Sequence, residues 1–381
     1  MAAPVKGLGC VVRELHKPFT IEELTFAAPG PHEVRLKVYA CGVCQSDVSA
    51  INGKFPLTLP CVLGHEGAGV VESLGEGVDD SWGVGDHAIL TLNTPCNACP
   101  SCLDGRMWLC ENKTKTTPVG RVTDKTGAIL TIFQQLGCMA EYVVVHKSAL
   151  IRVDKDVPLE KAALISCSVS TGAGAAINRA QVQPGSSCCV FGCGGVGLNV
   201  IQGARICGAT QIIAVDTNPS KLEAAKVFGA THTVNAKEAK NVSRAVSAAS
   251  TAGTGVDYCF ECIGQPATVE TAVKATKRGG TMVGVGVGSA ADLISFKLNI
   301  LSNLEKTLTG AMMGSAAPAR FVPMLVNMYK KGDLKLAELI SRYYTVSNAH
   351  AAFDDLYSGA NRRGVIVMHE LESSAADTSK L

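Results

Sequence analysis

Four cysteines lie close together in one short stretch of the chain. Cys96, Cys99, Cys102 and Cys110 follow the spacing C-x2-C-x2-C-x7-C. Four thiolates so near one another can complete the tetrahedral coordination of a zinc ion and leave no position for water, which predicts a structural zinc site. Four buried cysteines or two disulfides are the alternatives, although a chance cluster this tight is improbable. A closed zinc site points to a second, open one elsewhere in the chain, which would carry the chemistry.

A glycine-rich turn carries the second signal. It consists of Gly192, Cys193, Gly194, Gly195, Val196 and Gly197, and it lies between a β-rich run and an expected helix. In this context the first glycine permits a tight turn, the second lets the backbone approach a pyrophosphate, and the last lets helix and strand pack closely. The phosphates would lie at the positive end of the helix. The alternative is that these glycines only form an ordinary turn and bind no cofactor.

An acidic residue strengthens the prediction of a dinucleotide site. Asp216 ends the next expected strand, roughly 20 residues after the turn, where a carboxylate accepts hydrogen bonds from the adenosine ribose. The same carboxylate would repel a 2′-phosphate, which favours NAD over NADP. Lys221, one turn into the following helix, could reach the same ribose or be a solvated surface lysine.

A nicotinamide cofactor needs a group that polarises an alcohol or carbonyl oxygen. Cys44, His65 and Cys167 form a set that could give a zinc ion three protein ligands and one open position. Their spacing alone does not show that they converge, since His65 could be a turn histidine and Cys167 a buried thiol.

The composition is typical of a compact enzyme. The chain has 381 residues, 47% of them hydrophobic and 18% charged, which suits two or three domains. A formal net charge of +2 gives no electrostatic case for nucleic acid or an anionic membrane surface. No apolar run approaches the roughly 20 residues that span a bilayer, and residues 1–9 lack a signal-peptide pattern. We therefore expect neither a nucleic-acid nor a membrane partner.

The cysteine content and the C-terminal residues indicate the cellular compartment in which the protein is expected. Sixteen cysteines without a secretory signal indicate a reducing compartment, where they act as metal ligands and small buried residues. The last three residues, Ser379-Lys380-Leu381, match a peroxisomal address and follow a polar stretch. We expect recognition by the peroxisomal import receptor; without import, the protein would be cytoplasmic.

Two patterns divide the chain. Up to about residue 168, short runs such as 34–39, broken by glycine and proline, predict a partly closed β-barrel. From about residue 186, strands such as 187–191 and 256–261 alternate with helices such as 219–228, which predicts a doubly wound parallel sheet. A last strand, 364–368, is expected to return to the first domain.

Several segments, in order along the chain, resemble zinc-dependent medium-chain alcohol dehydrogenases. They are Gly42–Asp47, Gly64–Gly69, the four-cysteine loop and Val190–Gly197, and the similarity runs from about residue 10 to Met368. Cys167–Gly174 and Arg363–Val367 resemble the class-III-like and aryl-alcohol branch. The resemblance implies an α/β fold. A GroES-like catalytic domain, 1–168 and 312–381, would carry both zinc sites, and a Rossmann domain, 169–311, would bind NAD.

The resemblance also implies roles for single residues. Cys44, His65 and Cys167 would bind a catalytic zinc, and the four-cysteine loop a structural zinc. Asp47 would orient His65, Glu66 would be an acid able to approach the metal, and Ser46 would hydrogen-bond the reacting oxygen and pass on its proton. Thr171, Val196 and Val285 would line the nicotinamide, and Arg363 would contact the pyrophosphate. We thus expect two zinc ions per chain, NAD(H), and interconversion of primary medium-chain or aromatic alcohols with aldehydes or ketones.

Three positions depart from the family's pattern. Ser49 stands where relatives often carry the histidine that ends the proton relay, so the proton must leave through water or another base. Gln45 replaces a basic residue against the pyrophosphate, which should weaken cofactor binding. Thr114 replaces the arginine that glutathione-dependent formaldehyde dehydrogenases use for the glutathione carboxylate. Thiol-dependent formaldehyde oxidation is therefore demoted, without being excluded, and is the alternative function.

A non-enzymatic zinc or redox-sensing protein is less favoured, because it would need neither Asp216 with the glycine turn nor an open metal site. Relatives form homodimers through the edge of the cofactor sheet, near residues 289–308 here, and some form tetramers. We expect a homodimer that acts on a small alcohol or aldehyde.

Overall fold

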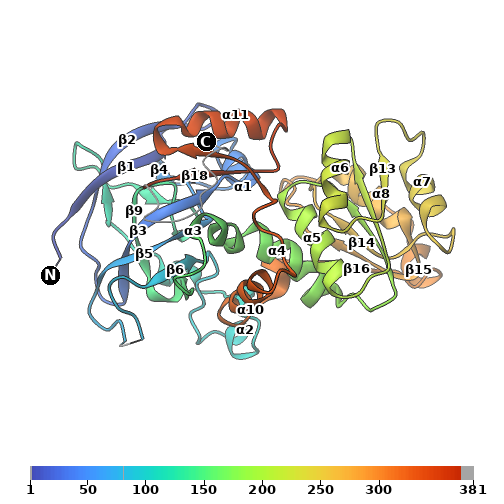
Figure 1. Ribbon diagram of the computed structural model, residues 1–381, viewed down its shortest axis with the longest axis horizontal. Helices are drawn as coiled ribbons and strands as arrows, with labels where there is room; N and C mark the ends of the chain where they lie inside the picture. The colour runs from blue at the N-terminus through green and yellow to red at the C-terminus, as the bar shows by residue number, and fades with distance from the viewer. Residues whose placement is uncertain (1, 80, 370–381) are drawn as a thin grey trace. The chain divides into compact units, whose positions relative to one another are not determined.

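The computed structural model describes residues 2–79 and 81–369. The chain divides into two compact units, of which the first contains the residues up to Cys167 and those from Ala317 onward, and the second is Ser168–Ala316. The sequence patterns placed the corresponding boundaries after residues 168 and 311. Figure 1 shows the course of the chain by colour. The peroxisomal address Ser379-Lys380-Leu381 lies outside the described residues.

Sheet A of the first unit forms the barrel-like part. Its strands lie in the order β7 (Val122–Thr123), β2 (Thr20–Phe26), β1 (Val5–Val12), β4 (Cys61–Val62) and β8 (Thr131–Ile132). Alternate residues of these strands, among them Val11, Leu24, Phe26 and Val62, point inward and pack into one apolar core. This sheet confirms the predicted GroES-like barrel.

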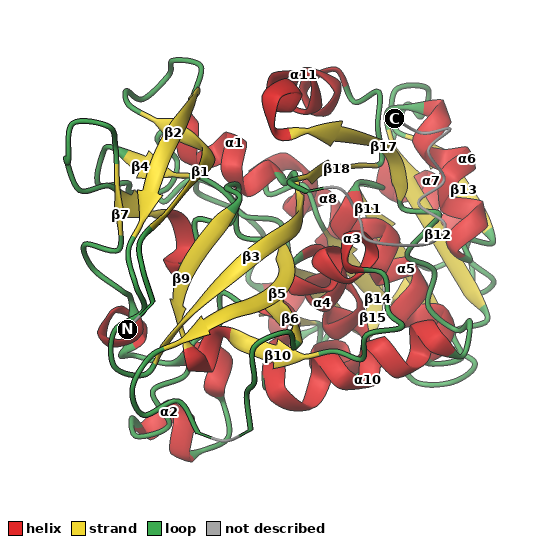
Figure 2. Ribbon diagram, turned by 60° about the vertical axis from the view of Figure 1, so that its left-hand side comes forward, coloured by secondary structure: helices red, strands yellow, loops and turns green. Residues whose placement is uncertain are grey.

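Sheet B completes the first unit. Its strands lie in the order β10 (Leu150–Arg152), β6 (His87–Leu90), β5 (Gly67–Leu74), β3 (Glu33–Gly42), β18 (Arg363–Val367) and β17 (Ile340–Thr345), and β9 (Tyr142–His146) also pairs with β3. Figure 2 shows β3 between β9 and β5. The last strand, β18, pairs with the end of β3 and so joins the C-terminal part of the chain to the N-terminal part.

The helices of the first unit are mostly short. They are α1 (Gln45–Ile51), α2 (Pro100–Leu103), α3 (Leu159–Ala162), α10 (Pro318–Lys330) and α11 (Ala349–Ser358). The 3-10 turns are Met107–Leu109, Lys113–Thr116, Phe133–Gln135, Lys147–Ala149, Ala163–Ser166 and Val346–Asn348. The helix predicted at 159–165 is thus α3 continued by a 3-10 turn, and Cys167 follows directly after it.

Sheet C of the second unit is parallel at every pairing in the described residues. Its strands lie in the order β13 (His232–Asn235), β12 (Gln211–Asp216), β11 (Ser187–Phe191), β14 (Val256–Glu261), β15 (Thr276–Gly284) and β16 (Thr307–Gly310). The strand order reverses direction between β11 and β14. In open α/β sheets, ligands bind beyond the carboxyl ends of the strands at such a reversal.

Helices cover both faces of sheet C. They are α4 (Ser168–Gly174) with its π-helical continuation Ala175–Ala180, α5 (Gly195–Ile206), α6 (Pro219–Phe228), α7 (Val242–Ala249), α8 (Pro266–Ala275), α9 (Asn299–Ser302) and the 3-10 turn Met313–Ser315. Cys189 and Phe191 of β11 face the core that contains residues of α7 and α8. Val190, on the opposite face, lies against Gly197 of α5. This arrangement confirms the predicted doubly wound sheet.

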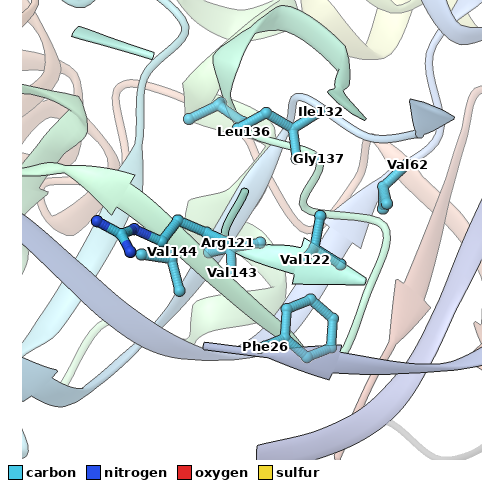
Figure 3. A pocket seen from close by; sticks show the side chains of 9 residues that line it. All are labelled: Phe26, Val62, Arg121, Val122, Ile132, Leu136, Gly137, Val143 and Val144. Carbon is cyan, nitrogen blue, oxygen red and sulfur yellow. The ribbon is translucent and has the colours of Figure 1, made fainter. Parts of the chain in front are cut away.

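None of the helices in the described part of the chain is long and apolar enough to span a membrane. A cavity of about 10 Å³ lies inside the barrel and holds room for roughly one water molecule. It is lined by Phe26, Val62, Arg121, Val122, Ile132, Leu136, Gly137, Val143 and Val144 (Figure 3). This cavity is too small for a substrate.

Candidate metal and dinucleotide sites

Three segments far apart in the sequence bring Cys44, His65 and Cys167 together in the first unit. Cys44 is the residue before α1, His65 lies between β4 and β5, and Cys167 follows the 3-10 turn after α3. Their ligand atoms and a carboxylate oxygen of Glu66 all lie within 4.8 Å of one another. All four residues are buried.

Asp47 fixes the orientation of the His65 imidazole. Its Oδ1 lies 3.3 Å from His65 Nδ1 and also accepts the backbone N–H of Gly64 at 3.1 Å. The other oxygen accepts the N–H of Cys44 at 3.3 Å. Nδ1 therefore donates to Asp47, and Nε2 is left buried with no hydrogen-bond partner among the described residues. An imidazole held in this way presents Nε2 as a metal ligand.

The two thiols of the cluster influence each other. The hydrogen bond between Cys167 and Cys44 lowers the pKa of Cys44 well below its usual range and raises the pKa of Cys167. A thiolate is therefore favoured at Cys44, and thiolate is the form of cysteine that binds metals. One nitrogen and two sulfurs within reach of one point form the donor set of an open zinc site.

Glu66 and Arg363 form a buried ion pair next to this cluster. One Arg363 Nη donates to Glu66 Oε2, and Oε1 of the same carboxylate has no partner among the described residues. Burial raises the pKa of the Glu66 carboxyl to about 8, although the Arg363 guanidinium opposes the shift. The family resemblance implied that Glu66 can approach the metal and that Arg363 contacts a pyrophosphate. That assignment stays a prediction, and the pairing with Glu66 was not foreseen.

Phe133 is a neighbour of the cluster that sequence reasoning missed. Its ring meets the His65 imidazole edge-on, with centroids 5.5 Å apart and an interplanar angle of 87°. The residues that follow, Gln134 and Gln135, both have positive φ angles, of 51° and 64°. Nothing in the sequence around Phe133 signals such a turn, because glutamine has no preference for this backbone region.

The four-cysteine loop forms a second cluster in the first unit. Its sulfurs all lie within 4.8 Å of one another. The backbone N–H of Cys99 donates to Cys96 Sγ, and that of Cys96 to Cys110 Sγ, both at 3.3 Å. Such hydrogen bonds stabilise thiolates, and the N–H groups of Ala98 and Cys99 are the main reason why the pKa of Cys96 falls to about 6. The donor set fits a closed tetrahedral zinc site.

The glycine turn connects β11 to α5 in the second unit, at the strand-order reversal of sheet C. Gly192 has a φ of 87°, and a Cβ on Gly197 would lie 1.8 Å from the Gly192 carbonyl oxygen, so only glycine fits there. A Cβ on Gly194 would meet no atom within 4 Å. The space in front of Gly194 is open, as the approach of a phosphate to the backbone requires.

Asp216 is fixed beside this turn. Its Oδ2 accepts the backbone N–H of Cys193 at 2.8 Å, and Oδ1 accepts that of Asn218 at 2.9 Å. The carboxylate thus lies at the carboxyl end of β12, next to the predicted phosphate site. Lys221 lies in the first turn of α6 and is half-buried, and its contact with a ribose stays a prediction.

Thr171, Val196 and Val285 all belong to the second unit. Thr171 lies on α4 beside Gly172, whose hypothetical Cβ would touch the Val196 carbonyl oxygen, so α4 packs closely on α5. Val285 follows β15 and bonds through its N–H to the carbonyl of Glu261. Their predicted contacts with a nicotinamide remain untested, as does the role of Ser46 in the first turn of α1.

Glu261 is a second residue that the sequence analysis overlooked. It ends β14 and is fully buried. Its carboxylate accepts the N–H groups of Ile263 and Gly264 at 3.0 Å and the hydroxyl of Thr268 at 2.7 Å. It therefore shapes the loop that lies against Gly192. The sequence did contain a signal for this residue, because Glu261 is an acid at the end of an apolar strand that was expected in the same sheet as the glycine turn.

Two protein-family models match the chain. The alcohol dehydrogenase GroES-like domain matches residues 30–155, and the zinc-binding dehydrogenase model matches residues 195–330. A class-3 alcohol dehydrogenase from Drosophila melanogaster is 39% identical over 368 residues, which are 93% of this chain and 96% of the relative.

Solved structures agree with this similarity. An alcohol dehydrogenase zinc-binding domain protein from Burkholderia ambifaria superposes with a TM-score of 0.91 at 34% identity. Benzyl alcohol dehydrogenase from Acinetobacter calcoaceticus superposes with a TM-score of 0.89 at 32% identity. Each comparison covers 96% of this chain and 100% of the other, so the similarity extends over both units.

Proposed function

Because this chain belongs to the zinc-binding alcohol dehydrogenase family, we propose that it interconverts alcohols and aldehydes or ketones by hydride transfer to and from NAD(H). The observation that carries the proposal is the buried cluster of Cys44, His65 and Cys167, in which His65 Nε2 lacks a partner among the described residues. An unpaired buried nitrogen between two thiols is costly in a protein unless an ion completes it.

The residues of this cluster fit a zinc ion that keeps one position open for substrate. Such an ion acts as a Lewis acid that lowers the pKa of an alcohol hydroxyl and polarises a carbonyl. Asp47 would keep the imidazole in the correct tautomer through its bond to Nδ1. Glu66 pairs with Arg363 through Oε2 only, so its carboxylate would be available next to the ligands. The four-cysteine loop would hold a second, structural zinc ion.

The second unit would hold the dinucleotide. Backbone N–H groups at the start of α5 would bind the pyrophosphate, and the Asp216 carboxylate would accept hydrogen bonds from the ribose hydroxyls. Its negative charge favours NAD(H) over the 2′-phosphorylated cofactor. Thr171, Val196 and Val285 would contact the nicotinamide. Bound there, the nicotinamide would supply the hydride acceptor for alcohol oxidation, and the proton of the hydroxyl would be left for residues of this chain to accept.

The released proton would pass through Ser46, on the first turn of α1. Ser49 lies three residues on, on the same side of the helix, and cannot hold a proton near neutral pH. We expect alcohol oxidation to be slower at neutral pH than in relatives with a histidine there. A Ser49→His variant should oxidise alcohols faster near pH 7, and an unchanged pH profile would count against this route.

The substrate we propose is a primary medium-chain or aromatic alcohol, or its aldehyde. Phe133 beside His65 provides apolar surface near the metal cluster, and one similar structure is a benzyl alcohol dehydrogenase. The alternative, thiol-dependent formaldehyde oxidation, is distinguished by assaying formaldehyde with and without glutathione. A strict requirement for glutathione would favour the alternative.

The test of the proposed function combines metal content with turnover. The purified full-length chain should contain two zinc ions and form NADH from benzyl alcohol or a primary alkanol. His65→Ala should lose one zinc ion and all turnover, whereas His232→Ala, which alters an exposed histidine of the second unit, should lose neither. Turnover that survives in His65→Ala would refute the proposed site.

We also propose a homodimer and import into peroxisomes. Within residues 289–308, Leu293 and Leu298 are 86% and 78% exposed, and apolar side chains so exposed favour a second copy as their partner. Light scattering should show a dimer that Leu293→Glu with Leu298→Glu dissociates. A fluorescent fusion that ends in Ser379-Lys380-Leu381 should enter peroxisomes and should stay outside when Leu381 is removed.

A further inference from the structure

The turn after Phe133 has an unusual backbone. Gln134 has φ 51° and ψ 34°, and Gln135 has φ 64°. Two consecutive non-glycine residues in the left-handed region are strained, because their Cβ atoms crowd the neighbouring carbonyl groups. Such strain persists only where the surrounding structure over-determines the conformation.

A buried threonine supplies the constraint. Thr94 is 1% exposed, and its hydroxyl donates to Oε1 of Gln135. The same hydroxyl lies 2.9 Å from that of Thr116, in the 3-10 turn that follows the four-cysteine loop. The strained turn is thus tied through one side chain to a part of the chain that is distant in sequence.

The turn acts on a metal ligand through Phe133. This residue is 3% exposed, and its ring lies edge-on to the His65 imidazole at 5.5 Å. His65 is also held by Asp47 at 3.3 Å, which is long for a hydrogen bond. Packing by Phe133 therefore adds to the limit that Asp47 sets on rotation of the imidazole.

We propose that Thr94 is a positioning residue of the metal cluster: it binds Gln135, stabilises the strained turn and so keeps Phe133 against His65. It acts through Gln135 and Phe133 rather than on a reacting atom. Its effect depends on the strain, which gives the proposal a distinctive test, since glycine adopts positive φ without strain. A Gln134→Gly substitution should make the turn less dependent on Thr94.

The experiment uses the zinc-loaded full-length chain and two measurements. The first is the rate at which zinc passes to a chelator, with His65→Ala identifying the phase that belongs to the Cys44, His65 and Cys167 cluster. The second is kcat/KM for benzyl alcohol at saturating NAD. The kinetic measurement rests on the proposed function, whereas zinc release does not. If the wild-type protein has no turnover, the proposed function fails, and the zinc-release rates alone test the role of Thr94.

Thr94→Val should release zinc about tenfold faster from that cluster and lower kcat/KM about tenfold, as for other residues that orient metal ligands. Thr94→Ser, which keeps the hydroxyl, should restore both within about threefold. In a Gln134→Gly background the effect of Thr94→Val should fall below about threefold.

Gln135→Met removes the same hydrogen bond from the other side and replaces Thr94→Val if that variant does not fold. Equal effects of Thr94→Val with and without Gln134→Gly would overturn the proposal. Unchanged zinc release and kcat/KM in a folded Thr94→Val variant would overturn it as well.

Discussion

Replacing Gly194 by alanine is expected to weaken cofactor binding while the second unit keeps its fold. The new Cβ would meet no atom of the described chain within 4 Å. Gly194 has φ −80° and ψ −169°, a conformation that alanine adopts without strain. Because Gly194 precedes the first turn of α5, alanine there costs only about 0.5–1 kcal/mol, the difference between glycine and alanine at the start of a helix.

The effect on the cofactor should be larger. The second glycine of such a turn lets a pyrophosphate reach the backbone N–H groups, and the Cβ would occupy that approach. We expect the Kd for NADH to rise at least about tenfold, which is about 1.4 kcal/mol. The cost to binding therefore exceeds the cost to folding.

Gly197 provides the matched control. A Cβ there would lie 1.8 Å from the Gly192 carbonyl oxygen and 2.9 Å from its carbon. Both atoms belong to the backbone, so α5 and β11 must separate by more than an ångström to restore a contact of about 3.5 Å. We expect Gly197→Ala to destabilise the protein by about 3 kcal/mol or more.

Fluorescence titration with NADH and urea unfolding of the same preparations distinguish the two variants. Gly194→Ala should unfold at nearly the wild-type urea concentration but bind NADH weakly. If Gly194→Ala binds NADH as tightly as the wild type, no phosphate approaches this turn and the dinucleotide assignment is wrong. If it unfolds as readily as Gly197→Ala, the open space in front of Gly194 is not real.

Three further predictions concern the first unit. Asp47→Asn should weaken zinc retention about 10- to 100-fold, measured by release to a chelator, because it removes the carboxylate that orients the ligand histidine. Arg35→Met removes the Arg35 hydrogen bonds to the Glu72 carboxylate and to three backbone carbonyls and should cost about 2–3 kcal/mol in urea unfolding. Lys6→Met, in an exposed pair, should cost less than about 1 kcal/mol. Burial raises the pKa of the Glu160 carboxyl in the folded protein. The buried carboxyl therefore stabilises the fold fully at pH values below the ordinary carboxyl pKa, where it is protonated in both states. This stabilisation is lost as pH rises through the raised pKa. Glu160→Gln should therefore raise the Tm at about pH 8 and not at about pH 4.

The parts of the site that short spacing specifies were predictable. The four cysteines lie in one loop, and the glycine turn lies between a strand and a helix, so neighbouring residues alone predict both features. Asp216 follows from the same logic, because the carboxyl ends of adjacent parallel strands lie at one edge of the sheet.

The convergence of Cys44, His65 and Cys167 depends on long-range packing instead. Cys167 is brought to the other two by α3 and its 3-10 continuation. The residues alone left this convergence open, and only the family resemblance favoured it. The ion pair between Glu66 and Arg363 is harder still, since it depends on β18 pairing with the end of β3. No local pattern specifies which buried acid a buried arginine meets.

Two turns of this chain reach positive φ by different means, and the difference predicts where function is fragile. Gly192 adopts a φ of 87° without strain, so no side chain has to compensate for strain at this position. Gln134 and Gln135 adopt positive φ only because other groups compensate the strain, with Thr94 among them. A substitution such as Gly194→Ala should therefore act through steric contact with the cofactor, whereas substitutions around Gln135 should act at a distance, through Phe133 and the imidazole of His65.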